Sequence, residues 1–156
     1  MKKEFNIKDQ IAAIKKLSPR IKLVMMPEDT NYMGKIFGGA IISQLDLAAA
    51  EHCYSISKND YFVTRALKEV TLEEPVFVGD VLSFYTTTEK IGNSSITVGV
   101  TILGERNKGG KSSEHFIGDG SVVLVAIDKK GKATKVKSLL KAQAKSPVIS
   151  TGKNHR

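Results

Sequence analysis

The residues most suited to chemistry lie between Asp29 and Asp46, where two glycines precede an apolar segment that contains one carboxylate. Gly38 and Gly39 stand at the predicted start of a helix, at which the first backbone N–H groups have no helical acceptor and the helix dipole is positive. That position suits an oxyanion or a polarised carbonyl. Asp46 follows within the helix among Leu, Ala and Ile, where a buried carboxylate is costly unless it is paired or performs chemistry. The pattern therefore predicts a catalytic site.

Each of these residues also has a purely structural interpretation. Asp46 could pair with Arg65 or a backbone amide, or could face solvent. Asn31, in the polar loop before the helix, could form an ordinary Asx turn. The two glycines could serve only a sharp strand-to-helix turn that needs small residues. The residue types alone leave these alternatives open.

The elements that must position these residues follow from the apolar pattern. From Gly38 to about Ile56, apolar or small residues lie on most sides of the predicted helix, which is typical of a buried helix. Segments rich in Val, Ile, Thr, Phe and Tyr, bounded by turn-forming residues, predict strands. These strands are expected at 21–26, 61–72, 81–91, 94–106 and 116–128, with a loop over 107–113. Together they predict an α+β domain in which a five-stranded, mainly antiparallel sheet surrounds one long helix.

Charge is distributed unevenly along the 156 residues, whose net charge is +8. After Asp128 there are nine basic residues and no acid, whereas residues 1–128 hold 15 basic and 16 acidic residues. A nucleic-acid groove spreads basic and aromatic residues over the fold, so this distribution argues against nucleic-acid binding. We expect one domain at 21–132, an amphipathic helix within 1–20, and a basic, partly disordered tail at 133–156. Some tail lysines could lie near an anionic ligand.

Several classes of protein are excluded. No apolar run approaches the roughly 20 residues that a membrane helix needs, and the N-terminus lacks the apolar part of a secretory signal, so we expect a cytoplasmic protein without membrane contact. Cys53 is the only cysteine, and the adjacent His52 points about 100° away on a helix, so we interpret Cys53 as a core residue. Because His52, His115 and His155 have no zinc-ligand spacing, we expect no metal.

Residues 29–46, DTNYMGKIFGGAIISQLD, resemble the signature of hot-dog-fold acyl-coenzyme A thioesterases, in particular the bacterial YciA-like acyl-CoA hydrolases. The resemblance extends from about residue 23 to about residue 132. It implies the hot-dog fold and places Asp46 at the catalytic carboxylate. It also implies that Asn31 and the N–H groups of Gly38 and Gly39 hold the thioester oxygen or the attacking water. Coenzyme A would be part of substrate and product, so no separate cofactor is expected.

The resemblance also implies a place for coenzyme A on a hairpin of the sheet. An ordinary polar hairpin and a satisfied ion pair are the structural alternatives. The residues assigned to coenzyme A are Arg65, Lys90, Gly92, Asn93, Ser94 and Ser95.

Helix geometry predicts assembly. At 1.5 Å per residue, Gly38 and Asp46 stand about 12 Å apart along one helix, too far to act on one carbonyl carbon. Two chains with antiparallel helices would bring Asp46 of one chain to the Gly38 amide of the other. The family resemblance implies such sites at a homodimer interface, often with three dimers in a hexamer.

Three functions therefore compete. The first is hydrolysis of an acyl-CoA thioester to free acid and coenzyme A, with Asp46 as general base or as nucleophile. The second is a hot-dog dehydratase, which would need a histidine that the loop from Asn31 to Phe37 lacks. The third is a non-catalytic acyl-CoA binding module, against which the complete set of Asn31, Gly38 and Asp46 argues.

Overall fold

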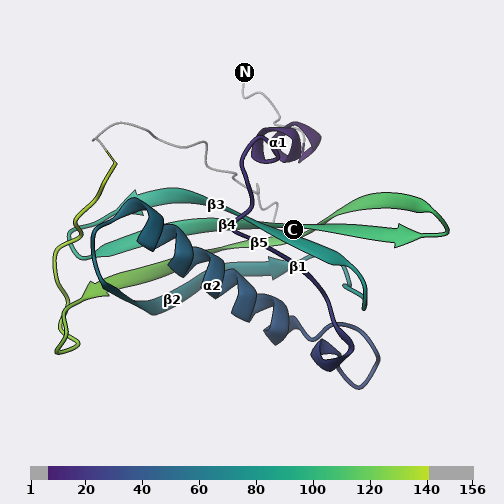
Figure 1. The fold of residues 1–156 in the computed structure, drawn as a ribbon, viewed down its shortest axis with the longest axis horizontal. Helices are drawn as coiled ribbons and strands as arrows, with labels where there is room; N and C mark the ends of the chain where they lie inside the picture. Colours follow the sequence, from purple (N-terminus) through teal and green to yellow (C-terminus); the bar gives the residue numbers. More distant parts are fainter. Residues whose placement is uncertain (1–6, 141–156) are drawn as a thin grey trace, which may run out of the picture.

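The fold is one curled five-stranded sheet packed against a long helix (Figure 1). A computed structural model describes residues 7–140 of the chain. All four strand pairings are antiparallel, in the order β1-β3-β4-β5-β2, so β1 and β2 form the edges. The elements are α1 (Ile7–Ile14), β1 (Ile21–Val24), the 3₁₀ turn η1 (Pro27–Asp29), α2 (Gly38–Ile56), β2 (Tyr61–Leu72), β3 (Val81–Ile91), β4 (Ser95–Lys108) and β5 (Lys111–Ile127). The predicted α+β hot-dog fold is confirmed.

The two helices cover opposite faces of the sheet. Side chains alternate between faces along a strand, and Phe84 of β3 belongs to the core under α2 while the next residue, Tyr85, contacts α1. The inner core combines Leu45, Ala48 and Ala49 of α2 with apolar side chains of the sheet. The smaller outer cluster joins Ile14 of α1 to Tyr85 and Leu103. This arrangement fixes α2 firmly on the sheet.

The β4–β5 hairpin is longer than the sequence suggested. Pairing continues to Lys108 opposite Lys111, and only Gly109 and Gly110 form the turn. Both glycines have positive φ, 58° and 74°, as a tight hairpin turn with the twist of the strands requires. The prediction of a loop over 107–113 is wrong, because backbone pairing continues where the apolar pattern has ended.

The segment after β5 returns across the end of the domain. Asn93 of the β3–β4 hairpin accepts a hydrogen bond from the Val136 N–H, and Ile56, the last residue of α2, accepts one from the Leu139 N–H, both at 2.8 Å. Residues 141–156, the larger part of the predicted basic tail, and residues 1–6 lie outside the described residues. No helix between residues 7 and 140 is long and apolar enough to cross a bilayer.

Candidate active site

The loop before α2 is shaped by Asn31. Its side-chain oxygen accepts hydrogen bonds from the N–H groups of Met33 (2.9 Å) and Lys35 (3.2 Å), and its own N–H donates to the Lys35 carbonyl at 2.7 Å. Asn31 therefore does form an Asx turn, the structural role considered for it. Its Nδ2 amino group donates no hydrogen bond within residues 7–140, so this donor remains free for a ligand.

The N-terminus of α2 has no side-chain cap. Phe37 occupies the N-cap position, where a capping Ser, Thr, Asp or Asn is usual, and makes no side-chain capping bond. The Phe37 carbonyl accepts from the N–H groups of Ala40 (3.0 Å) and Ile41 (3.4 Å). The N–H groups of Gly38 and Gly39 precede these and have no backbone acceptor in the described part of the chain. Two donors at the positive end of a helix dipole are thus available to an anionic oxygen.

Both glycines lie close to neighbouring side chains. A Cβ at Gly38 would stand 3.3 Å from Cδ1 of Leu72, and a Cβ at Gly39 would stand 2.6 Å from the ring of Phe37. A side chain at Gly39 would have to displace the Phe37 ring, whereas one at Gly38 would need only a small shift of Leu72. The close packing supports the structural interpretation of the double glycine and leaves its N–H groups accessible for the functional one.

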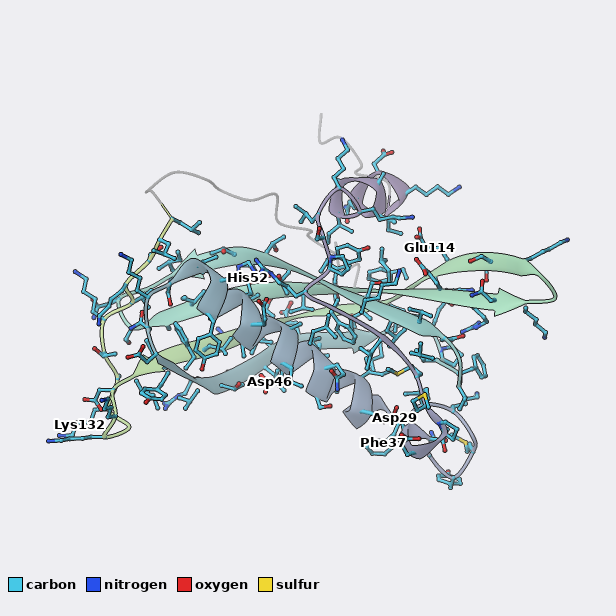
Figure 2. The ribbon with its side chains drawn as sticks, viewed as in Figure 1. Asp29, Phe37, Asp46, His52, Glu114 and Lys132 are labelled. Carbon is cyan, nitrogen blue, oxygen red and sulfur yellow. The ribbon has the colours of Figure 1, made fainter. Side chains whose placement is uncertain are left out.

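Asp46 lies partly buried near the middle of α2 (Figure 2), where Thr64 of β2 donates its hydroxyl hydrogen to Asp46 Oδ1 at 2.7 Å. Oδ2 of Asp46 has no hydrogen-bond partner among residues 7–140. The ladder between β2 and β5 skips Arg65, which is exposed in a β-bulge directly after Thr64. The carboxylate is therefore held by Thr64, and the alternative of an Asp46–Arg65 pair does not occur within the chain.

Sequence reasoning missed Thr64. It lies 18 residues after Asp46 on a strand in which threonine is an ordinary β-former, and no spacing rule links a helix residue to that position. Only its place opposite Asp46 across the helix–sheet contact identifies it.

The residues assigned to coenzyme A do not gather around the glycines of their own chain. The hairpin that bears Lys90 and residues 92–95 lies near the C-terminal end of α2, since the segment bound to Asn93 also bonds Ile56. Gly38 stands at the other end of the helix, and Arg65 lies on the edge strand β2. Within one chain, the amide donors lie at the start of α2, the carboxylate near its middle and the hairpin near its end.

Two further titratable residues on α2 are fixed in inert states. His52 is held between the hydroxyl groups of Thr86 and Thr88, each at 2.8 Å, and burial together with the charge of Arg20 lowers its pKa to about 4. Burial raises the pKa of Cys53 to about 12, so its thiol stays protonated, as expected for a core residue. Among the described residues, no three His, Cys, Asp or Glu side chains come together as metal ligands.

Comparison with known proteins identifies the family. The Thioesterase superfamily matches residues 33–111. The acyl-CoA thioester hydrolase YciA of Salmonella typhimurium is 30% identical over 72% of this chain and 84% of its own length. A hexameric hotdog-fold thioesterase of Campylobacter jejuni superposes with a TM-score of 0.73 at 37% identity, over 78% of this chain and 91% of the other.

A hexameric broad-specificity acyl-coenzyme A thioesterase, solved as a variant with one aspartate replaced by alanine, gives a TM-score of 0.72 at 29% identity over 76% of this chain and 85% of the other. The chain therefore belongs to the thioesterase superfamily, within the hot-dog-fold acyl-CoA thioesterases related to YciA.

Proposed function

We propose that this acyl-CoA thioester hydrolase uses Asp46 as its general base or nucleophile. The observation that carries the proposal is the state of the Asp46 carboxylate. One oxygen is anchored by Thr64 at 2.7 Å and the other is unoccupied by any described residue, on a helix that begins with two free N–H donors. A general base or nucleophile needs an oxygen that neighbouring side chains leave free, and Asp46 Oδ2 meets this condition.

The chemistry follows from the donors. A thioester carbonyl oxygen accepts from the N–H groups of Gly38 and Gly39, with Asn31 Nδ2 as a further donor to the oxygen or the water. Asp46 then either removes a proton from water that attacks the carbonyl carbon, or attacks it directly to form a mixed anhydride that water hydrolyses. Either route breaks the C–S bond, and the coenzyme A thiolate leaves and is protonated.

Two chains complete the site in this proposal. The rise along α2 separates Gly38 from Asp46 by about 12 Å, so the donors come from a second protomer with an antiparallel α2. Two features favour such a homodimer. Leu47 and Tyr54 on the outer face of α2 are 55% and 46% exposed, and the edge strand β2 exposes Val63 and Leu67 with one side unpaired. The hexameric relatives support a trimer of such dimers.

The test is release of free thiol from acyl-CoAs of increasing chain length by the wild-type protein and by Asp46→Asn. The substitution keeps the shape of the side chain and removes its basicity, so turnover falls by about 100-fold or more on every substrate. Glu51→Gln is the matched control. It removes another carboxylate of α2, one that makes only a surface ion pair with Arg20 at 3.2 Å, and leaves turnover unchanged. Wild-type turnover by Asp46→Asn would remove Asp46 from the mechanism.

A further inference from the structure

The segment that follows β5 carries five lysines between residues 129 and 137, here called the lysine strap: Lys129, Lys130, Lys132, Lys135 and Lys137. Its backbone is held by Asn59, a residue only 7% exposed. Asn59 Nδ2 donates to the Lys135 carbonyl at 3.0 Å, and its oxygen accepts from the Lys137 N–H at 2.7 Å. One buried amide thus fixes the backbone on both sides of Val136.

Further backbone bonds hold the strap along its length. The Thr134 N–H donates to the Ala126 carbonyl at 2.8 Å, and the Lys58 N–H donates to the Lys137 carbonyl at 2.9 Å. Val136 is buried at 8% exposure, while Lys135 and Lys137 on either side of it are exposed. The extended backbone therefore turns one apolar side chain inward and presents two ammonium groups outward from a fixed frame.

The ammonium groups of the strap have no ion-pair partner in the described part of the chain. None of its lysines forms an ion pair there, and neither does Lys58 beside it. The nearest acid in sequence, Asp128, uses Oδ1 to accept the backbone N–H groups of Lys130 and Lys132 at 2.8 and 3.0 Å. Like charges carried on a fixed backbone repel one another in the absence of an anion, so the strap forms a site for a polyanion.

The distance from Asp46 to the end of α2 indicates which polyanion fits the strap. The strap lies at the C-terminal end of α2, because the N–H of Lys58, two residues after the helix, donates to the Lys137 carbonyl. Ile56, the last residue of the helix, is about 15 Å from Asp46 along the helix. Figure 2 places Asp46 between Phe37, at the helix start, and Lys132, at the far end of the molecule. The arm of coenzyme A between the thioester sulfur and the diphosphate has about the length of four extended residues, roughly 14 Å.

We propose that the lysine strap binds the phosphate groups at the nucleotide end of coenzyme A, with Lys135 and Lys137 as the principal contacts. The inference rests on the proposed function, since the distance is counted from Asp46. It also gives the β3–β4 hairpin a place in recognition, because Asn93 accepts a hydrogen bond from Val136 at 2.8 Å and so aligns the hairpin beside the strap.

The test compares an acyl-CoA with the same acyl group on pantetheine, which lacks the nucleotide and its phosphates. In the variant Lys135→Gln, Lys137→Gln, KM for acyl-CoA rises about tenfold through loss of charge-assisted contacts, while kcat is unchanged. KM for acyl-pantetheine does not change. The matched control, Lys108→Gln with Lys111→Gln, removes the same charge at the tip of the β4–β5 hairpin and leaves both KM values as they were.

Two results would overturn the inference: an unchanged KM for acyl-CoA in the strap variant, or an equal rise for both substrates, which indicates a structural role only. A third measurement, competitive inhibition by adenosine 3′,5′-bisphosphate, must weaken in the strap variant and persist in the control. Failure of the proposed function gives a different result, since Asp46→Asn would then hydrolyse acyl-CoA at the wild-type rate, whatever KM the strap variant shows.

Discussion

Thr64 is the residue that determines how the Asp46 carboxylate is oriented. A carboxylate on a helix can rotate about its terminal bonds, and a hydroxyl donor at 2.7 Å selects one orientation and leaves the other oxygen pointing elsewhere. Because Thr64 belongs to β2 and Asp46 to α2, this bond also ties the carboxylate to the sheet. In the proposed mechanism Thr64 is therefore a positioning residue, which acts on the reaction through Asp46.

Replacing Thr64 by Val tests that role. Val keeps the shape and the strand preference of Thr but removes the hydroxyl donor, so we expect kcat to fall about tenfold from the loss of one orienting hydrogen bond, with KM nearly unchanged. Thr64→Ser, which keeps the donor, must restore kcat. Equal loss of activity in the Ser and Val variants would assign Thr64 to packing instead.

At the scale of elements, the apolar pattern was sufficient for α2, β2 and β3, whose bounds agree with the predicted ranges 38–56, 61–72 and 81–91. It failed in the outer half of the β4–β5 hairpin, where polar residues such as Asn107 and Ser112 pair across the ladder. Hydrogen bonds between backbones, together with the Gly109–Gly110 turn, hold that part of the sheet.

In the candidate site, too, the sequence predicts the local features but not the contacts between elements. Asp46 and the glycines could be predicted because an isolated acid and a helix start are local features of the sequence. Thr64 and the Asn59 clamp could not, since each depends on a contact between residues of different elements.

The sequence predicts no chemical role for the turn between β2 and β3. This turn nevertheless supports the loop before α2. Its Val76 carbonyl accepts the Ile36 N–H at 2.9 Å. The turn is closed by Asp80, which is 3% exposed and accepts hydrogen bonds from Arg106 at 2.7 and 2.9 Å and from the Phe77 N–H at 3.0 Å. Burial by itself would raise the pKa of Asp80, but the bonds and charge of Arg106 outweigh it and lower the pKa.

The lowered pKa of Asp80 determines how the stability of the fold changes with pH. The unfolded chain takes up a proton at Asp80 at higher pH than the folded chain does, so the stabilisation is complete above the unfolded pKa and is lost as pH falls through the folded pKa. Asp80→Asn removes the charge, and we expect it to lower the free energy of unfolding at pH 7 by about 2 kcal/mol.

Urea unfolding at pH 7 and in steps below pH 4 measures the loss of stability and its pH dependence. The difference in free energy of unfolding between wild type and Asp80→Asn must become smaller as the pH falls. Glu105→Gln, which breaks a surface pair with Lys22 at 3.3 Å, is the control and has little effect. A gap that stays constant with pH would contradict the charge assignment.

At the scale of the whole molecule, one chain places the groups of the proposed site too far apart to act together. The donors at the start of α2 and the carboxylate near its middle are fixed to one rigid rod, and no side-chain rotation closes the roughly 12 Å between them. In the proposed dimer, a second copy would cover the exposed apolar residues of α2 and β2. Activity is therefore expected to belong to the interface of two chains.

Subunit complementation tests this arrangement. One inactive variant carries Asn31→Ala with Gly38→Pro, which removes the loop donor and the Gly38 N–H at a helix position that accepts proline. The other carries Asp46→Ala. In a mixed dimer, one of the two sites combines an intact loop with an intact Asp46, and the other has neither. After random exchange of an equal mixture, half of the dimers are mixed, so thiol release should recover to about a quarter of the wild-type rate.

The exchange itself must be verified first, by co-purification of differently tagged subunits, because unmixed dimers stay inactive for a trivial reason. A second measurement is the mass in solution by light scattering across protein concentrations, with activity followed in parallel. If activity fails to recover after verified exchange, or if a monomer is fully active, the donors and the carboxylate act within one chain. Either outcome would require α2 to bend between Gly38 and Asp46, since a straight helix cannot bring the two to one carbonyl carbon.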